Sequence, residues 1–449
     1  MNQMKKNLTN LAFSLVSFLL ITSCNEKKID DKSGMFLNSK EHSSNYTSLP
    51  IKNNPKTVWK FKTDGQVISS PVVVGNQLFV GSNDANMYAI DKLSGKVIWK
   101  YKTGGKITST PLIANGKVLF LSFDGFFYAL DREKGTLIWK FKTGGEAIFN
   151  VKDYYNGTFK PDFWDFYLSS AIEKDGVVFF GSSDTNVYAL DIKTGKKVWD
   201  FKTGAGVHSS PAISKNSLVI GSWDGKVYSL DVSTGKELWS YQTEKDMEQY
   251  IWLGIQASPS IQNNTVYIGS RDAKMYAFDL ISGDTIWTKN EFDKSWMPSS
   301  VAIGSESIYT GSSDSFKFFS LDKKTGKIKY GTKTNAYTFS TPGIDNEMGY
   351  IGVANGRMLG IDLKSGEINW EYKTVGAKTD TVKLFDAAGK MDVPKYRELT
   401  KGVKDMPTLS KIYDKAFISV GAILSSPAVS NQVIYFGASD GYIYAISDK

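Results

Sequence analysis

Residues 209–239 read SSPAISKNSLVIGSWDGKVYSLDVSTGKELW, and the fold can be predicted from this stretch. Four short segments with the composition of strands lie in it and just beyond it, at 212–214, 218–221, 226–231 and 237–242. Asn216, the Asp224-Gly225 pair and the Thr234-Gly235-Lys236 triplet separate them, and such residues suit tight hairpin turns. The stretch therefore predicts four consecutive antiparallel strands.

The same phrase returns along the chain as Ser-Ser-Pro, a β-branched run, Gly-Ser-x-Asp, Tyr-Ala-x-Asp, a turn ending in Gly-Lys, and a Trp. The phrase opens eight times, at Pro71, Pro111, Ala171, Pro211, Pro259, Val301, Pro342 and Pro427. The matching turn residues are Asp84, Asp124, Asp184, Asp224, Asp272, Asp314, Asn355 and Asp440. Four-stranded units repeated about every 40 residues are typical of propellers. The sequence therefore predicts an all-β fold, an eight-bladed β-propeller with four-stranded antiparallel blades.

The aromatic residue that ends each unit shows how the ring closes. Seven such residues follow the eight openings, and the eighth, Trp59, lies near the other end of the chain. The chain stops after the third strand of the eighth unit, at Ile446-Ser447. We therefore expect the strand around Trp59 to complete the last blade, so that the N- and C-terminal strands pair and leave no long free sheet edge.

The recurring phrase Ala-x-Asp-x-x-Thr-Gly-Lys-x-x-Trp, found intact at residues 189–199, resembles the tryptophan-docking motif of the quinoprotein propeller family. The likeness covers residues 58–449, and seven copies follow it with small departures. In that family the tryptophan of an outer strand packs between neighbouring blades. The resemblance thus implies a structural docking role for Trp59, Trp99, Trp139, Trp199, Trp239, Trp287, Tyr330 and Trp370.

The first residues have the features of an export signal. Lys5 and Lys6 precede an apolar run of eleven residues, at 11–21, which would rise about 16 Å as a helix and so is too short to span a bilayer. Ile21-Thr22-Ser23-Cys24 resembles the lipobox of bacterial lipoprotein signals. That resemblance implies removal of residues 1–23 and acylation of Cys24, for example with palmitate. Residues 24–57 are polar and predict a flexible tether ahead of the propeller.

Composition excludes several classes of function. The chain has one cysteine and two histidines, which exclude an intramolecular disulfide and argue against a cysteine- or histidine-built metal site. The formal net charge of +8 is spread through the repeats, so nucleic acid is not an expected partner. No Gly-x-Ser-x-Gly, His-Glu-x-x-His or phosphate-binding loop occurs, and we assign no catalytic, cofactor-binding or metal-binding residue.

Two insertions interrupt the repeat, at 145–168 and 375–422, and both fall between the last strand of one blade and the first strand of the next. Such connections emerge on one face of a propeller. The larger insertion contains helix-compatible pieces such as 394–403. The candidate binding face consists of aromatic residues in these and neighbouring connections: Phe163, Trp164, Tyr167, Tyr250, Trp252 and Trp296. Either they bury one another as a lid over the axis, or they form an exposed patch for a protein segment or a sugar.

A lipidated eight-bladed propeller of this length resembles the outer-membrane protein assembly lipoproteins of the BamB type. The resemblance implies a non-catalytic scaffold, without a cofactor, that acts as a monomeric subunit of the barrel-assembly machinery. It also implies anchoring to the outer membrane, on the periplasmic face rather than the cell surface. The two insertions exceed what the resemblance leads us to expect. Two alternatives remain: a ligand- or glycan-binding surface propeller, and a dehydrogenase that uses pyrroloquinoline quinone (PQQ) with calcium.

Overall fold

The computed structural model describes residues 33–152, 159–244 and 254–449. The predicted signal peptide and Cys24 lie outside these residues, as do Tyr250 and Trp252. Within the described ranges, no helix combines the length and the hydrophobicity needed to cross a membrane.

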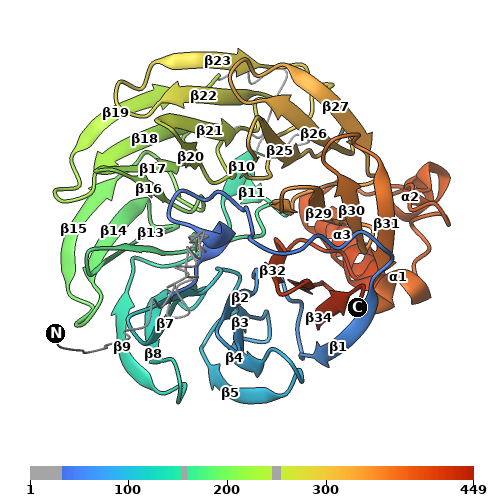
Figure 1. The fold of residues 1–449 in the computed structure, drawn as a ribbon, viewed down its shortest axis with the longest axis horizontal. Helices are drawn as coiled ribbons and strands as arrows, with labels where there is room; N and C mark the ends of the chain where they lie inside the picture. The colour runs from blue at the N-terminus through green and yellow to red at the C-terminus, as the bar shows by residue number, and fades with distance from the viewer. Residues whose placement is uncertain (1–32, 153–158, 245–253) are drawn as a thin grey trace, which may run out of the picture. The chain divides into compact units, whose positions relative to one another are not determined.

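Eight four-stranded antiparallel sheets are arranged around a common axis in residues 33–449 (Figure 1). Blades 1 and 2 consist of β2 (Val72–Val74), β3 (Gln77–Gly81), β4 (Asn86–Asp91), β5 (Val97–Lys102), β6 (Leu112–Ala114), β7 (Lys117–Ser122), β8 (Phe126–Asp131) and β9 (Leu137–Lys142). Blades 3 and 4 consist of β12 (Ile172–Lys174), β13 (Val177–Gly181), β14 (Asn186–Asp191), β15 (Lys197–Lys202), β16 (Ala212–Ser214), β17 (Ser217–Gly221), β18 (Lys226–Asp231) and β19 (Glu237–Gln242).

The other half of the ring repeats this order. Blades 5 and 6 consist of β20 (Ser260–Gln262), β21 (Thr265–Gly269), β22 (Met275–Asp279), β23 (Thr285–Lys289), β24 (Ala302–Ile303), β25 (Ser307–Gly311), β26 (Lys317–Asp322) and β27 (Ile328–Lys333). Blades 7 and 8 consist of β28 (Gly343–Ile344), β29 (Met348–Val353), β30 (Arg357–Asp362), β31 (Ile368–Lys373), β32 (Ala428–Ser430), β33 (Val433–Gly437), β34 (Tyr442–Ser447) and β1 (Lys56–Lys62). The predicted eight-bladed propeller is confirmed.

The N- and C-terminal strands close the ring as predicted. Blade 8 has the strand order β1-β34-β33-β32, and β1 runs antiparallel to β34 with Trp59 opposite Ala445. The hydrophobic core lies between adjacent blades rather than in one central mass. Phe127 of blade 2, for example, stacks on Phe180 of blade 3 with ring centroids 4.1 Å apart. Closure therefore joins blade 8 to blade 1 by the same kind of contact that joins every other pair.

Seven of the eight predicted docking residues reach the next blade through one hydrogen bond each. The indole N–H of Trp199, for example, donates to the carbonyl oxygen of Val232 at 3.0 Å, and the Tyr330 hydroxyl donates to that of Leu363 at 2.9 Å. The ring of Trp199 also lies against Gly235, where a Cβ atom would approach within 2.6 Å. Corresponding bonds come from Trp59, Trp99, Trp139, Trp239 and Trp287.

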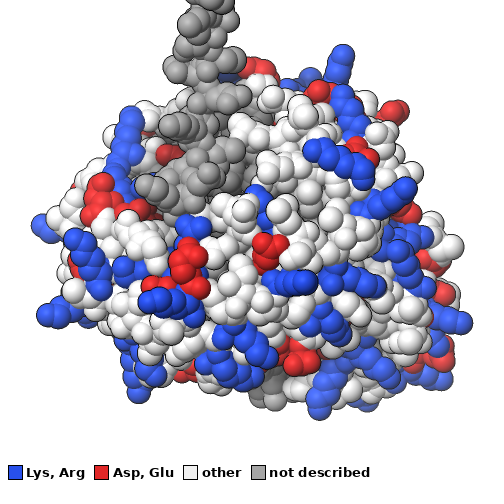
Figure 2. All heavy atoms as spheres, turned by 60° about the horizontal axis from the view of Figure 1, so that its bottom comes forward, with Lys and Arg blue, Asp and Glu red and all other residues white. Residues whose placement is uncertain are grey.

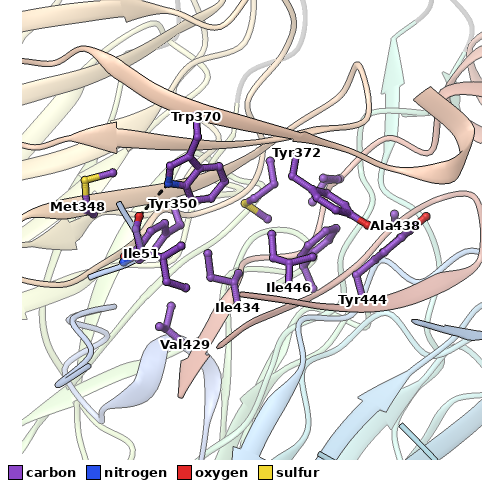
Figure 3. Packing of buried hydrophobic residues seen from close by; sticks show 13 residues of the cluster. Ile51, Met348, Tyr350, Trp370, Tyr372, Val429, Ile434, Ala438, Tyr444 and Ile446 are labelled. Carbon is purple, nitrogen blue, oxygen red and sulfur yellow. Dashed lines mark hydrogen bonds between the residues drawn. The ribbon is translucent and has the colours of Figure 1, made fainter. Parts of the chain in front are cut away.

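The eighth docking residue, Trp370, finds its acceptor in the N-terminal segment. Its indole N–H donates to the carbonyl oxygen of Ile51 at 2.8 Å, and the Ile51 amide donates to the Tyr350 hydroxyl at 2.8 Å (Figure 3). Blade 8 has no turn of its own between its third and fourth strands, because these come from opposite ends of the chain. The segment around Ile51 takes the place of that turn.

Residues 33–51 do not behave as the predicted flexible tether. They pass from blade to blade at one end of the axis (Figure 1), and we call them the N-terminal clasp. Clasp backbone groups bond the innermost strands of blades 2, 4, 5, 6 and 7, at Ile113, Ile213, Ile261, Ile303 and Ile344. The tether prediction was wrong for these residues because their stabilising bonds are made mainly by the backbone, which leaves no apolar period in the sequence.

The two insertions carry additional elements on the other end of the axis. The first forms a hairpin of β10 (Asn150–Lys152) and β11 (Phe159–Pro161). The second forms α1 (Val375–Thr379), α2 (Val393–Leu399) and α3 (Met406–Val420), beside blades 7 and 8 in Figure 1. Asp405 caps α3 through the amide of Thr408, and Gly421 ends it in the left-handed conformation.

Candidate functional site

A belt of hydroxyl groups surrounds the axis of the ring. The residue just before the opening of each blade is a serine or threonine, and in six blades its backbone amide donates to the hydroxyl of the corresponding residue in the next blade. The bonds described are 2.9–3.0 Å long and begin at the amides of Thr110, Ser170, Ser210, Ser258, Thr341 and Ser426. The belt encloses a cavity of about 40 Å³. That volume accommodates little more than ordered water.

Both ends of this cavity are covered. In each blade the innermost strand begins at the end of the axis that carries the insertions and ends near the clasp. Residues that precede this strand therefore lie toward the insertions, and residues that follow it lie toward the clasp. Phe36 of the clasp lines the cavity from one end. Tyr167 and Leu168 of the first insertion line it from the other, together with Phe339. The axis is therefore a plugged core in the described residues.

The first insertion and α3 pack together into one aromatic cluster, which we call the cap. Trp164 is only 6% exposed and lies against Tyr337, Phe339, Tyr413 and Phe417, with ring centroids 5.0–5.9 Å apart. Insertions from different blades emerge on the same face and bury each other's rings, which removes a large apolar area from water. Trp164 is therefore part of a lid of mutually buried rings and not of an exposed patch.

The other described members of the predicted binding face are also used in packing. Phe163 is half-buried and stacks on Tyr413 at 5.3 Å. The Tyr167 hydroxyl donates to the carbonyl oxygen of Leu424 at 2.7 Å. Trp296 is half-buried against a guanidinium group. The structure thus brings Phe163, Trp164 and Tyr167 together, but the exposed aromatic patch does not exist at Trp164.

A buried arginine anchors the cap to blade 5. The Arg271 guanidinium is fully buried and lies between the rings of Trp223 and Trp296, 4.4 and 4.6 Å from their centroids. It forms an ion pair with Asp162 and bonds Gln256 Oε1 at 2.8 Å. The Gln256 amide in turn donates to the carbonyl oxygen of Trp164 at 2.8 Å. Two aromatic faces and a paired charge compensate for the lost hydration of the cation.

A second buried network lies beside the first. His208 Nδ1 is 2.8 Å from Asp165 Oδ1, and its Nε2 is 2.7 Å from Ser183 Oγ. Ser183 Oγ donates to Glu146 Oε2 at 2.8 Å, and Glu146 Oε1 accepts a bond from Ser182 at 2.6 Å. Asp165 also accepts the Phe149 amide at 2.8 Å. The network therefore ties both strands of the first insertion to blades 3 and 4.

The distances between Ser183, His208 and Asp165 resemble those of a nucleophile, a base and an orienting acid. When Glu146 is ionised, the Ser183 hydroxyl donates to it, and His208 then donates through Nε2 to Ser183 and through Nδ1 to Asp165. In that state no unprotonated nitrogen faces Ser183, whereas a general base needs one. The paired carboxylates favour the charged imidazolium in this network.

The pKa directions agree with this description. Burial disfavours the charged form of His208, but Asp165, with Glu146 and Asp162, outweighs it and raises the pKa of the imidazole above 6.5. Burial also raises the pKa of the Glu146 and Asp162 carboxyl groups, although Ser182 and Ser183 oppose the shift at Glu146 and Arg271 opposes it at Asp162.

Arg271, Asp162, Asp165 and Glu146 were not predicted from the sequence. The variable residue x of the repeated Gly-Ser-x-Asp turn could have indicated this region. That residue faces the cap, and in blades 3, 4 and 5 it is Ser183, Trp223 and Arg271. The two aspartates stand in the Asp-Phe-Trp-Asp sequence of the first insertion, where Asp162 Oδ1 accepts the Trp164 amide at 2.9 Å.

The axial cavity of the described residues is small compared with the sites that usually hold small molecules. Sites for small molecules usually enclose roughly 300–1,000 Å³, whereas the axial cavity measures about 40 Å³. The buried carboxylates near the axis, Asp162 and Asp165, already pair with Arg271 and His208. No cluster of three or more potential ligands for a metal ion occurs in residues 33–152, 159–244 and 254–449.

The sequence of the chain matches one protein family over most of the propeller. Residues 52–152, 164–295 and 292–388 match the sequence profile of the family described as outer membrane protein assembly factor BamB. The crystal structure of BamB from Moraxella catarrhalis superposes with a TM-score of 0.62 at 16% identity, over 88% of this chain and 98% of that one. A comparison with curated protein sequences gives no match.

Two dehydrogenases share the fold to a similar degree. The quinohemoprotein alcohol dehydrogenase from Comamonas testosteroni has a TM-score of 0.64 at 13% identity, over 92% of this chain and 80% of that one. A europium-containing methanol dehydrogenase has a TM-score of 0.65 at 13% identity, over 92% and 98%. At this identity the likeness extends to the fold alone.

Proposed function

Because the chain belongs to the family of outer membrane protein assembly factor BamB, we propose that it is a non-catalytic scaffold that supports the assembly of β-barrel proteins in the outer membrane. In this proposal a lipid on Cys24 anchors the protein to the periplasmic face of that membrane. Its partners are subunits of the barrel-assembly machinery. The family match over most of the propeller carries the proposal.

The geometry supports a binding role without chemistry. The buried charged groups near the axis, Arg271, His208, Asp162 and Asp165, are paired with one another and hold the cap in place. The axial cavity is small and covered at both ends. A rigid ring that presents fixed loops loses little conformational entropy on binding, so its surface can recognise a partner efficiently.

The cap offers a surface that the repeat alone would not provide. No residue of α2 is buried, and the helix carries Lys395, Arg397 and Glu398 on a frame fixed by α3. The hydroxyl groups of Tyr396 and Tyr413 join α2 to α3 at 2.9 Å. We therefore assign the contact with protein partners to the cap side of the ring.

The proposal is tested in cells that lack the chain. We expect a lower amount of folded β-barrel protein in the outer membrane, seen as a reduced heat-modifiable fraction on gels, and restoration by the intact chain. Restoration by a form with Ser183→Ala separates scaffold from hydrolase, because a serine nucleophile would be lost. Unchanged β-barrel levels in the deletion strain would contradict the proposal.

The dehydrogenase alternative is tested by reconstituting the purified protein with PQQ and calcium and supplying a panel of alcohols. The scaffold proposal expects no dye-linked turnover above that of the free cofactor. Turnover that depends on the protein would replace the proposal. The glycan-binding alternative depended mainly on an exposed Trp164, and Trp164 is buried in the cap.

A further inference from the structure

Three adjacent outer strands, those of blades 8, 1 and 2, carry seven lysines, whereas the acid-free outer strands of blades 5 and 6, TIWTK and IKYGTK, carry three together. The sequences of β1, β5 and β9 are KTVWKFK, VIWKYK and LIWKFK, which contain lysine but no acidic residue. We call their lysines the lysine strip. All seven are exposed: Lys56, Lys60, Lys62, Lys100, Lys102, Lys140 and Lys142. Figure 2 shows this edge of the ring, where basic side chains predominate over acidic ones.

The lysines of the strip have no carboxylate partner among the described residues, whereas three lysines of other outer strands do. Lys197 pairs with Asp200 at 2.7 Å in blade 3, and Lys373 pairs with Glu371 at 3.7 Å in blade 7. No described carboxylate oxygen lies within 4.0 Å of a strip ammonium group. Within the described ranges the positive charge of the strip is therefore not neutralised.

Exposed aliphatic side chains accompany these lysines. Val58 is 52% exposed, Ile98 is 46% exposed and Ile138 is 45% exposed, each on the same strand as two or more strip lysines. Surfaces that combine lysines with aliphatic residues suit the interface of an anionic bilayer, because the ammonium groups approach phosphates and the apolar groups approach the acyl boundary.

The chain that would carry the lipid meets the ring at blade 2. Gly34 pairs with Ile113 on the innermost strand of blade 2. Ten residues separate Cys24 from Gly34, which is at most about 35 Å of chain. Strand spacing places the outer strand β9 roughly 14 Å from the innermost strand of that blade. A lipid on Cys24 is therefore within reach of the edge that carries the strip.

We propose that the lysine strip rests on the phosphate headgroups of an anionic lipid bilayer and so fixes the orientation of the ring on the membrane. This inference rests on the membrane anchoring in the proposed function. Each lysine near such a surface contributes about fivefold in affinity at moderate ionic strength. Anchor and strip together would then hold one edge of the ring against the bilayer and leave the cap free for partners.

The test uses the lipidated full chain in vesicles of phosphatidylcholine, alone or mixed with phosphatidylglycerol. Amine acetylation followed by mass spectrometry gives the labelling rate of each lysine. We expect labelling of Lys60, Lys100 and Lys140 to be about fivefold slower in the anionic vesicles. The exposed lysines Lys324, Lys327 and Lys333 of blade 6, across the ring, should react equally in both. About 1 M salt should remove the difference, because it screens charges beyond about 3 Å.

A matched pair of variants isolates the strip. Lys60→Gln with Lys100→Gln and Lys140→Gln should remove most of the protection of Lys62, Lys102 and Lys142. Lys324→Gln with Lys327→Gln and Lys333→Gln removes the same charge and should leave that protection unchanged. Protein that floats with both vesicles but shows equal labelling overturns this inference alone. Protein that floats with neither overturns the anchoring as well, whereas failure to capture barrel-assembly subunits refutes only the scaffold role.

Discussion

The Asp448 carboxylate accepts hydrogen bonds from the backbone amide of Lys52 at 3.1 Å and from that of Asn53 at 3.2 Å. In an unbroken blade one aspartate binds the amides two and three residues after it, as Asp191 does with Lys193 and Thr194. The residue in between supplies the carbonyl acceptor for the docking tryptophan, a place that Ile51 takes for Trp370. The two ends of the chain thus rebuild, without a covalent link, a turn that the other blades make in one piece.

Replacing Asp448 should therefore loosen the N-terminal segment. We expect Asp448→Ala to lower the free energy of unfolding by about 1–3 kcal/mol, since each lost bond involves a charged acceptor. Hydrogen exchange at the Lys52 and Asn53 amides should accelerate. Asp362→Ala, in the covalent turn of blade 7, is the control and should accelerate exchange at Lys364 and Ser365 instead. Unchanged exchange at Lys52 in Asp448→Ala would contradict the rebuilt turn.

Glycine is required at the turn that lies against the docking residue Trp199. The backbone there has a positive φ, and a Cβ atom would collide with the indole ring. Gly235 has φ +71° and faces Trp199, whereas Gly116 has φ +70° and lies in open space, where an added Cβ atom would contact nothing within 4 Å beyond its chain neighbours. Ala at either site costs about 1–2 kcal/mol for the left-handed backbone. Gly235→Ala should cost about 1–3 kcal/mol more than Gly116→Ala, measured by denaturant unfolding. Equal losses would show that Trp199 does not dock tightly.

The two histidines should give opposite dependences of stability on pH. The pKa of His208 is raised above 6.5, so its contribution is complete below pH 6.5 and is lost as pH rises through the folded-state value. His208→Gln should remove that alkaline decline. At pH 6 it should cost about 3–5 kcal/mol, because Asp165 then lacks its buried partner. A variant that keeps the wild-type decline would contradict the imidazolium assignment.

His42 of the clasp provides the matched control. Burial lowers its pKa to about 4, against a weaker opposing effect of its bond to the Pro259 carbonyl oxygen at 3.0 Å. Its contribution is therefore present above pH 6.5 and is lost as pH falls toward 4. Urea unfolding across this range should show that His42→Gln flattens the acidic side of the profile and leaves the alkaline side intact.

Removal of only one partner of the buried ion pair between Arg271 and Asp162 should strongly lower the free energy of unfolding. Arg271→Met leaves Asp162 buried without a partner and should lower the free energy of unfolding by about 3–5 kcal/mol. Adding Asp162→Asn should recover part of that loss, as a double-mutant cycle would show. Lys197→Met removes a pair with Asp200 in which both side chains are exposed, and it should cost at most about 1 kcal/mol. Additive losses at Arg271 and Asp162 would contradict their coupling.

The sequence contains most of what specifies the ring. Strands predicted at 212–214 and 226–231 coincide with β16 and β18, because alternation and hairpin residues act locally. The order of the repeats also predicts that β1 completes blade 8. Local periodicity thus determines both the blades and their closure.

The clasp and the cap were harder to predict because distant residues define them. The clasp is held largely by backbone groups that meet five blades, for example at Ile113 and Ile344, and no side-chain pattern records this. Arg271 reads as a turn residue until Asp162, 109 positions away, is placed against it. The exposure of Trp164 depends on α3, which joins it from the second insertion.

Affinity capture of the lipidated chain from detergent-solubilised outer membranes is the decisive test of the scaffold function. We expect the central subunit of the barrel-assembly machinery to be recovered with the intact chain, and a Cys24→Ala form, which lacks the anchor, to recover much less. Capture of the intact chain without that subunit, at full yield of folded propeller, would contradict the scaffold function.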